Sequence, residues 1–272
     1  MCCKISVLKT EENYLKKSTL QNINNTVGKT FESNGYGRFT VIRYEHYTRV
    51  YIQFENTGGL NMTGMYSIRE GCVVDLLAKT NYGVGYIGYG YDNKCKDSRK
   101  LLKTWYGVLQ RCFDPLWKGR HTSYEQTTCS EIFFCASDFI GWSKSQIGYN
   151  SVDEFGKPFA LDKDILIKGN TEYSPNTCVF VPQEINNLIL NSRSTRGLLP
   201  IGVTTKGSKF RARVSINKQE TALGVFDTKE EAFYAYKQAK EAYIKEVANK
   251  WKDKIDPRVY DALVNWKIEI TD

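Results

Sequence analysis

Residues 201–243 hold the pattern that most constrains how this chain can fold. Three short runs, at 201–204, 209–215 and 222–226, are separated by the polar turns KGS and NKQE. Alternating apolar and polar residues within such runs are typical of strands. The segment TKEE at 228–231 then predicts a capping box that begins a helix. The expected buried residues of that helix, three or four positions apart, are Ala232, Ala235, Tyr236, Ala239 and Tyr243.

The middle run of these three predicts a strand with one basic face. Its apolar residues alternate with cations, and residues 204–218 contain five cations and no acid. A small sheet with a row of Arg and Lys can enter the major groove and reach guanine edges or phosphates. The alternative is a solvated strand face without a ligand. The candidate DNA-binding residues are Lys206, Lys209, Arg211, Arg213, Lys218, Arg193 and Arg196.

Residues 200–245 resemble an AP2 domain. The segment GVTTKGSKFRARVSINKQETALGVFDTKEEAFYAYKQA carries the family's pattern of GV, a W/F-x-A-x-I/V strand, an LG-x-F hairpin, and T-x-E-E-A at the start of the helix. The family's usual Trp is Phe210 here. AP2 domains bind DNA through the three-stranded sheet, so the resemblance implies double-stranded DNA as the partner.

Residues 159–187 predict a ββα unit, in which two strands and the loop between them are followed by a helix. The first strand ends near Leu161, the second covers 178–181, and the helix runs from Pro182 to about Leu190. Proline suits the first helical turn, where the missing N–H has no partner to lose.

This unit resembles the HNH motif of phage homing endonucleases. LDKDILIKGNTEYSPNTCVFVPQEINN is similar to the family's D-H/R-I-D, G-x-Y-S-P-E-N-C-R-W and Q-x-x-N signature. The resemblance implies that Asp162 and Asn186, 24 residues apart (186 − 162), bind a divalent metal. The metal expected is Mg²⁺, or Mn²⁺, which favours oxygen ligands.

The sequence departs from the HNH pattern where the family has its general base. Lys163 occupies the His position, and Thr177 occupies that of the central Asn. A lysine is normally protonated at neutral pH and cannot accept a proton. Three alternatives keep catalysis: Asp164 acts as base, Lys163 stabilises phosphate charge, or His121 folds into the site. The fourth is that Asp162 and Lys163 form a purely structural turn.

The front half predicts a different kind of unit. From about residue 28 the period becomes 2, and Gly-rich turns separate the runs, which predicts a small β-barrel. The pattern G-x-F-x-V-I-x-Y, V-x-F, T-G and V-x-D resembles the leader of the same phage proteins. The α+β chain is divided into a lead-in (1–27), a small β-barrel-like domain (28–80), a Gly/Tyr-rich linker (81–98), an HNH-like domain with preceding helices near 99–113 and 129–142 (99–195), and an AP2-like domain with a C-terminal helix (196–272).

Composition bears on the redox state of the cysteines, on membrane association and on the charge of the expected partner. The eight cysteines include no CxxC pair and only two histidines accompany them, so we expect reduced thiols and no structural zinc. Apolar runs such as 185–190 are too short to cross a bilayer. Residues 1–25 contain no continuous apolar core, so we expect no signal peptide. We expect a soluble monomer in the cytoplasm (that of the host cell, if the chain is phage-encoded), and no membrane partner. The net charge of +8 agrees with an anionic partner.

Three functions are consistent with these features. The first is a metal-dependent DNA endonuclease that nicks one strand, because one ββα unit holds one active site. The second is a DNA-binding accessory or regulatory protein of the same descent without catalysis. The third is a phage protein that binds and inhibits a host protein through its barrel and Tyr-rich linker.

Overall fold

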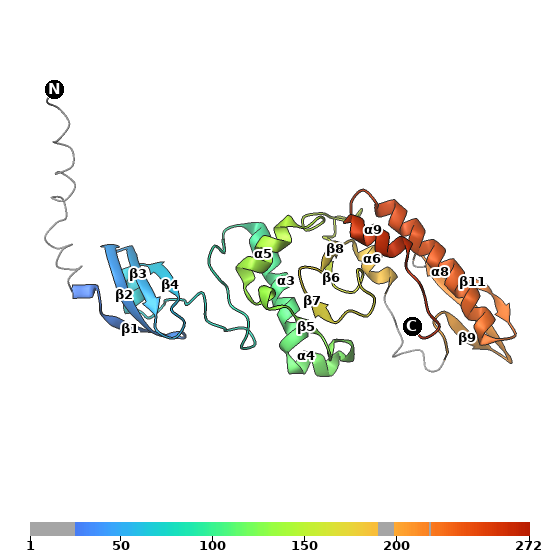
Figure 1. The fold of residues 1–272 in the computed structure, drawn as a ribbon, viewed down its shortest axis with the longest axis horizontal. Coiled ribbons are helices and arrows are strands. Elements are labelled where there is room, and N and C mark those ends of the chain that lie inside the picture. The colour runs from blue at the N-terminus through green and yellow to red at the C-terminus, as the bar shows by residue number, and fades with distance from the viewer. Residues whose placement is uncertain (1–24, 190–198, 218) are drawn as a thin grey trace, which may run out of the picture. The chain divides into compact units, whose positions relative to one another are not determined.

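The computed structural model describes residues 25–189, 199–217 and 219–272, whose helices and strands are labelled in Figure 1. The chain forms two compact units. The N-terminal unit comprises the described residues up to 93 together with 134–137, and the C-terminal unit comprises 94–133 and 138–272. Both contain helices and strands, so the predicted α+β class is confirmed.

The N-terminal unit contains one four-stranded antiparallel sheet. Its strands are β1 (Thr30–Ser33), β2 (Gly37–His46), β3 (Arg49–Phe54) and β4 (Leu60–Thr63). Their spatial order follows the chain, and the apolar positions of the alternating pattern are buried, Phe39, Val50 and Ile52 completely. Helix α2 (Met65–Arg69) adds Ile68 to the same core.

This sheet is not closed into the predicted barrel. Within the described residues, β1 pairs with β2 alone and β4 pairs with β3 alone. Each of these edge strands has four residues, whereas closure requires strands long enough to tilt around an axis and pair on both sides. Alternation indicates a sheet with one buried face, and an open sheet satisfies that requirement as well as a barrel does.

Two pieces of the leader pattern meet at a buried carboxylate. Asp75 is buried and accepts hydrogen bonds from Thr57 Oγ1 at 2.6 Å and from Leu77 N at 2.9 Å. A Cβ at Gly59 would overlap the Asp75 carboxylate. A buried carboxylate requires such donors to offset its lost hydration. The Thr-Gly and Asp of the pattern therefore hold the β3–β4 loop against the segment after α2.

Part of the Gly/Tyr-rich segment is fixed by main-chain hydrogen bonds. Ala136 N donates to Tyr86 O and Ser137 N to Ile87 O, both at 2.9 Å. These N–H groups belong to the first turn of α5 (Ala136–Ser145), where a helix offers them no internal partner. Residues 86 and 87 are thereby joined to the first two residues of α5, which belong to the same N-terminal unit.

The helices of the C-terminal unit pack around a buried tryptophan. Trp105 is completely buried, and its Nε1 donates to Phe133 O at 2.7 Å. The helix predicted over 129–142 is divided into a 3-10 turn (Glu131–Phe134) and α5. In the 3-10 turn Ile132 is 56% exposed, whereas the neighbouring Phe133 is completely buried. The helices before the turn are α3 (Lys96–Phe113) and α4 (Pro115–Arg120).

The predicted strand–loop–strand–helix order of the ββα unit is present. Its elements are β6 (Ala160–Asp162), β8 (Val179–Val181) and α6 (Gln183–Leu188). β6 and β8 are antiparallel, with Leu161 opposite Phe180. The loop between them contains β7 (Glu172–Tyr173), which pairs in parallel with β5 (Thr128–Cys129). That pairing attaches the loop to the preceding helical region.

The C-terminal module is a three-stranded sheet packed on a long helix. It contains β9 (Val203–Lys206), β10 (Lys209–Ile216), β11 (Gln219–Phe226), α8 (Lys229–Trp251) and α9 (Pro257–Val264). The strand order is β11-β10-β9, and Ala212 and Val214 of β10 are buried. The predicted capping box is confirmed, because Thr228 Oγ1 accepts from Glu231 N and Glu231 Oε2 accepts from Thr228 N, each at 3.2 Å.

Helix α8 extends beyond the sheet that it supports. It has 23 residues, a length of about 35 Å at 1.5 Å per residue. Of the five helix residues predicted to be buried, Ala232, Tyr236 and Tyr243 are buried, and Ala235 and Ala239 are half-buried. Charged side chains occupy much of its remaining surface. Neither α8 nor any other helix of the described segments combines the length and apolar character needed to span a membrane.

Candidate active site and nucleic-acid interface

One cleft of the C-terminal unit collects the residues identified by the HNH resemblance. It has a volume of about 510 Å³. Asp162, Lys163 and Asp164 line it from the end of β6 and the following loop, and Asn186 lines it from α6. We call it the Asp162 cleft. Its other wall comes from the C-terminal module and includes Ile201, Tyr236, Lys240, Ile244 and Trp266.

Asp162 is held in place by the loop that it begins. Its Oδ1 accepts hydrogen bonds from Asp164 N at 2.7 Å and Ile165 N at 2.9 Å. Burial raises the pKa of the Asp162 carboxyl, and the two hydrogen bonds oppose that rise. A partly desolvated carboxylate that faces a cleft gains more from a bound cation than an exposed one does.

Asn186 brings an amide to the same cleft from a different element. It is half-buried on the first turn of α6, where its N donates to Pro182 O at 3.2 Å. Within the described residues, no group of three or more His, Cys, Asp or Glu side chains could hold a metal ion. One carboxylate and one amide nevertheless suit Mg²⁺, which usually keeps several waters and completes its shell with substrate phosphate. The residues present therefore fit such an ion.

Lys163 is buried and makes two hydrogen bonds within the loop. It is 7% exposed, and its Nζ donates to Asp164 Oδ1 at 2.6 Å and to Asn170 O at 2.8 Å. Asn170 Nδ2 in turn donates to Lys163 O at 2.8 Å. Of the alternatives for this position, these contacts favour a structural role over stabilisation of phosphate charge.

Replacing Lys163 by Met is therefore expected to cost stability first. The change leaves Asn170 O without its donor and removes the partner of Asp164, a loss of about 1–3 kcal/mol in the free energy of unfolding. Urea denaturation measures it, with Lys168→Met as control. Lys168 pairs with Asp272 at 2.6 Å but is 41% exposed, and exposed pairs contribute about 0–1 kcal/mol. A Lys163→Met protein as stable as wild type would contradict the structural role.

Thr177, at the family's central Asn position, closes the turn before β8. It is buried, and its Oγ1 donates to Glu172 O at 2.8 Å and accepts from Ser174 N at 3.2 Å. The neighbouring thiol of Cys178 is completely buried, which raises its pKa to about 12. It is therefore protonated at neutral pH, and in that form it is not a metal ligand.

His121 is placed outside the Asp162 cleft. It lies between α4 and the turn at Thr122–Tyr124, is exposed, and its ring centroid is 4.2 Å from that of Trp117. Ser123 and Tyr124 line the cleft, whereas His121 does not. The structure therefore does not bring His121 into the lining of the cleft that contains Asp162.

The basic strand face is partly neutralised by acids that adjoin it. Arg213 pairs with Glu220 of β11 at 2.9 Å, and Lys209 pairs with Asp227 at 2.8 Å. Counting charges between residues 204 and 218 missed both acids, because they follow in the next strand and the turn after it. Arg211 has no ion pair within the described residues. Lys206 is exposed, and Lys218, Arg193 and Arg196 lie outside the described residues.

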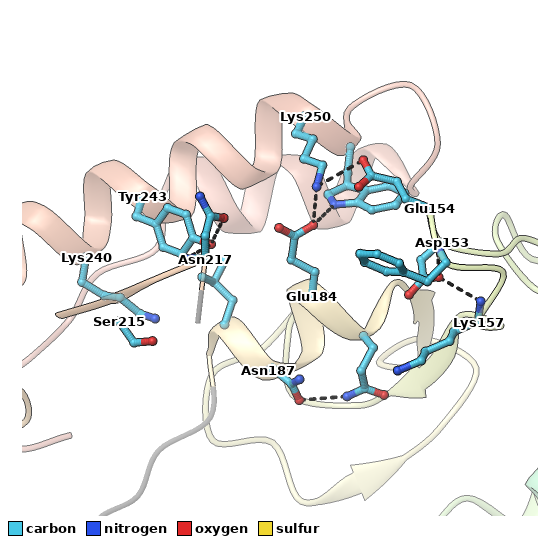
Figure 2. A pocket seen from close by; sticks show the side chains of 14 residues that line it. Asp153, Glu154, Lys157, Glu184, Asn187, Ser215, Asn217, Lys240, Tyr243 and Lys250 are labelled. Carbon is cyan, nitrogen blue, oxygen red and sulfur yellow. Dashed lines mark hydrogen bonds and ion pairs between the residues drawn. The ribbon is translucent and has the colours of Figure 1, made fainter. Parts of the chain in front are cut away.

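A clasp between α6 and α8 was not foreseen from the sequence. Glu184 Oε2 accepts hydrogen bonds from Lys250 Nζ at 2.9 Å and from Trp251 Nε1 at 2.7 Å (Figure 2). Lys250 Nζ also lies 3.3 Å from Glu154. These residues line a second cleft of about 540 Å³. Glu184 and Lys250 are 66 positions apart, so no local pattern could have indicated the pair.

Comparisons with known proteins leave the resemblance untested. No protein-family model matches the chain, and no curated protein or solved structure does so at a significant level. The assignment of function therefore depends on the geometry of the Asp162 cleft and of the basic sheet.

Proposed function

We propose that this chain is a metal-dependent DNA endonuclease of the HNH type, which binds duplex DNA through its C-terminal sheet and nicks one strand at the Asp162 cleft. The observation that carries the proposal is the shared cleft. Asp162 and Asn186 come from a strand end and a helix, and both line it. Two oxygen ligands at one cleft are what phosphodiester hydrolysis with a divalent ion requires of the protein.

Different side chains of the cleft would bind the ion, accept a proton and orient the proton acceptor. A divalent cation at Asp162 and Asn186 would supply charge that stabilises the phosphate as its bond to the leaving oxygen breaks. Asp164 lines the same cleft and is 44% exposed, so its carboxylate is the available proton acceptor for an attacking water. Lys163 keeps Asp164 oriented through their 2.6 Å ion pair.

A second candidate is a DNA-binding protein that does not cut. The lack of a histidine base favours this candidate. Lys163, at the family's His position, is buried and hydrogen-bonded to Asn170 O, and His121 does not line the cleft. Both candidates predict duplex binding that weakens with salt, so affinity alone cannot separate them.

The separating experiment is a plasmid-nicking assay with the full-length protein. Supercoiled DNA is incubated with Mg²⁺ or Mn²⁺, and in parallel with EDTA. Conversion to open circles in either metal, absent with EDTA, is the expected result. DNA that is bound but uncut in both metals would reject the endonuclease and leave the second candidate.

Arg211 is expected to be the main contributor of the sheet to DNA affinity. Arg211→Ala should weaken binding by about 1–3 kcal/mol, the usual cost of a lost base or phosphate contact, and by more than Arg213→Ala. Glu220→Gln should strengthen binding, because it removes a negative charge and releases Arg213. Fluorescence anisotropy on a labelled duplex measures each affinity.

Glu246→Gln, the same charge change at an exposed position of α8, is the matched control and should have little effect. Equal losses in Arg211→Ala and in a lysine variant far from the sheet would show that only overall charge matters.

A further inference from the structure

Six charged side chains line the Asp162 cleft, and four of them form two ion pairs with one another. Lys163 pairs with Asp164, and Lys168 pairs with Asp272, each at 2.6 Å. Asp162 accepts hydrogen bonds from main-chain N–H groups but has no ion pair in the described part of the chain. Lys240 is likewise without an ion pair there. One carboxylate and one ammonium are thus left, the charges that a metal ion and a phosphate would complement.

Lys240 lies where two clefts meet. It projects from α8 and lines both the Asp162 cleft and the cleft of Figure 2, as do Asn187 and Leu188. Figure 2 draws Lys240 on α8 and Ser215 of β10 among the residues that line the second cleft. Of the acids that line this second cleft, Glu154 and Glu184 both pair with Lys250, and Asp153 accepts hydrogen bonds from Phe155 N and Lys157 N. None of these acids has an ion pair with Lys240.

The ammonium of Lys240 is also poorly hydrated. The side chain is half-buried, and this burial lowers its pKa. Its Nζ makes a long cation–π contact with the Tyr243 ring, whose centroid is 5.9 Å away. Desolvating a cation without a counter-charge costs free energy, and that cost is recovered when an anion binds.

We propose that Lys240 binds a backbone phosphate of the DNA strand at the junction of the two clefts and positions that strand against Asp162 and Asn186. The inference rests on the proposed function, which it deepens. α8 would then contribute to DNA binding twice, by supporting the sheet and by supplying this contact. Lys240 is a positioning residue, because it contacts a phosphate beside the reacting one.

The test compares Lys240→Gln and Lys240→Arg with Lys245→Gln in the full-length protein. Lys245 lies five residues further along α8 and is exposed, so its replacement controls for the loss of one charge. Duplex affinity is measured in EDTA between 50 and 200 mM salt, where cleavage cannot interfere. Lys240→Gln should bind about tenfold more weakly at low salt. The slope of log K against log salt should fall by about 0.9, the value for one lost phosphate contact.

Lys240→Arg should keep most of the affinity, and Lys245→Gln should change it by less than about twofold. The nicking rate of Lys240→Gln under single-turnover conditions should fall about tenfold, by the same lost contact. Its thermal midpoint should not fall below that of wild type, because an uncompensated half-buried charge is removed.

Each outcome bears on one of the two proposals or on both. If wild type binds and Lys240→Gln keeps the wild-type slope, the Lys240 contact is wrong while the proposed function stands. If wild type binds but never nicks, the endonuclease is wrong and the salt slope still decides the contact. Absence of duplex binding by wild type at low salt would overturn both.

Discussion

Asp162→Asn is expected to abolish metal-dependent nicking while leaving the fold intact. The amide oxygen of Asn can still accept from Asp164 N and Ile165 N, which the Asp162 carboxylate binds at 2.7 and 2.9 Å. The negative charge that attracts a divalent cation is lost. Since metal charge stabilisation is worth several kcal/mol, the nicking rate should fall by at least about a hundredfold.

The matched control for this variant is Asp153→Asn. Asp153 Oδ1 also accepts two loop N–H groups, from Phe155 at 2.9 Å and Lys157 at 2.8 Å. It lines the cleft of Figure 2 and not the Asp162 cleft. Asp153→Asn should therefore nick like wild type. Wild-type nicking by Asp162→Asn would show that this carboxylate does not bind the metal, and affinity in EDTA would show whether DNA binding is retained.

Among glycine-to-alanine substitutions in the C-terminal module, Gly202→Ala should cause the largest loss of stability. Gly202 has a φ of +76°, and an added Cβ would overlap the ring of Tyr236 on α8. The left-handed backbone costs about 1–2 kcal/mol for a residue with a Cβ, and overpacking adds about 1–3 kcal/mol. Their sum, about 2–5 kcal/mol, corresponds to a fall in Tm of roughly 10 °C for the C-terminal unit.

Gly207→Ala separates the two costs. Gly207 lies in the β9–β10 turn with a φ of +62°, and a Cβ there would meet nothing within 4 Å. It should lose the backbone contribution alone, about 1–2 kcal/mol. Equal effects of the two alanines, measured by urea denaturation, would mean that Tyr236 moves aside without cost. Because Tyr236 also lines the Asp162 cleft, Gly202→Ala should additionally slow nicking.

Local patterns predicted the C-terminal module well, because its determinants are close in sequence. The capping box at Thr228 and the buried positions of β10 depend on neighbours within a few residues, and both are present. The predicted barrel is not supported by the open sheet of the described residues, and closure depends on edge strands that are distant in sequence. The single helix predicted over 129–142 is instead a 3-10 turn followed by α5, whose first two N–H groups donate to Tyr86 O and Ile87 O, residues distant in sequence.

The sequence indicated which residues would line the candidate site, but it did not indicate which charged side chains would form ion pairs. Asp162 and Asn186 were expected together, and they line one cleft. The pairing of Arg213 was missed because Glu220 lies opposite Ser215 across the hairpin, and such diagonal partners follow from strand register. The charge count considered one strand alone. No sequence pattern predicted a phosphate contact for Lys240, because that proposal depends on which neighbouring charges form ion pairs in the folded structure.

The clasp of α8 on α6 has a consequence for how such proteins can diversify. A DNA-reading module can be acquired by recombination when few contacts cross its boundary. Here Lys250 and Trp251, at the far end of the helix under the sheet, both bind Glu184 of the ββα unit. A foreign sheet-and-helix module joined near residue 200 would lack this match. New target sites should therefore arise by substitution within the strands more readily than by exchange of the whole module.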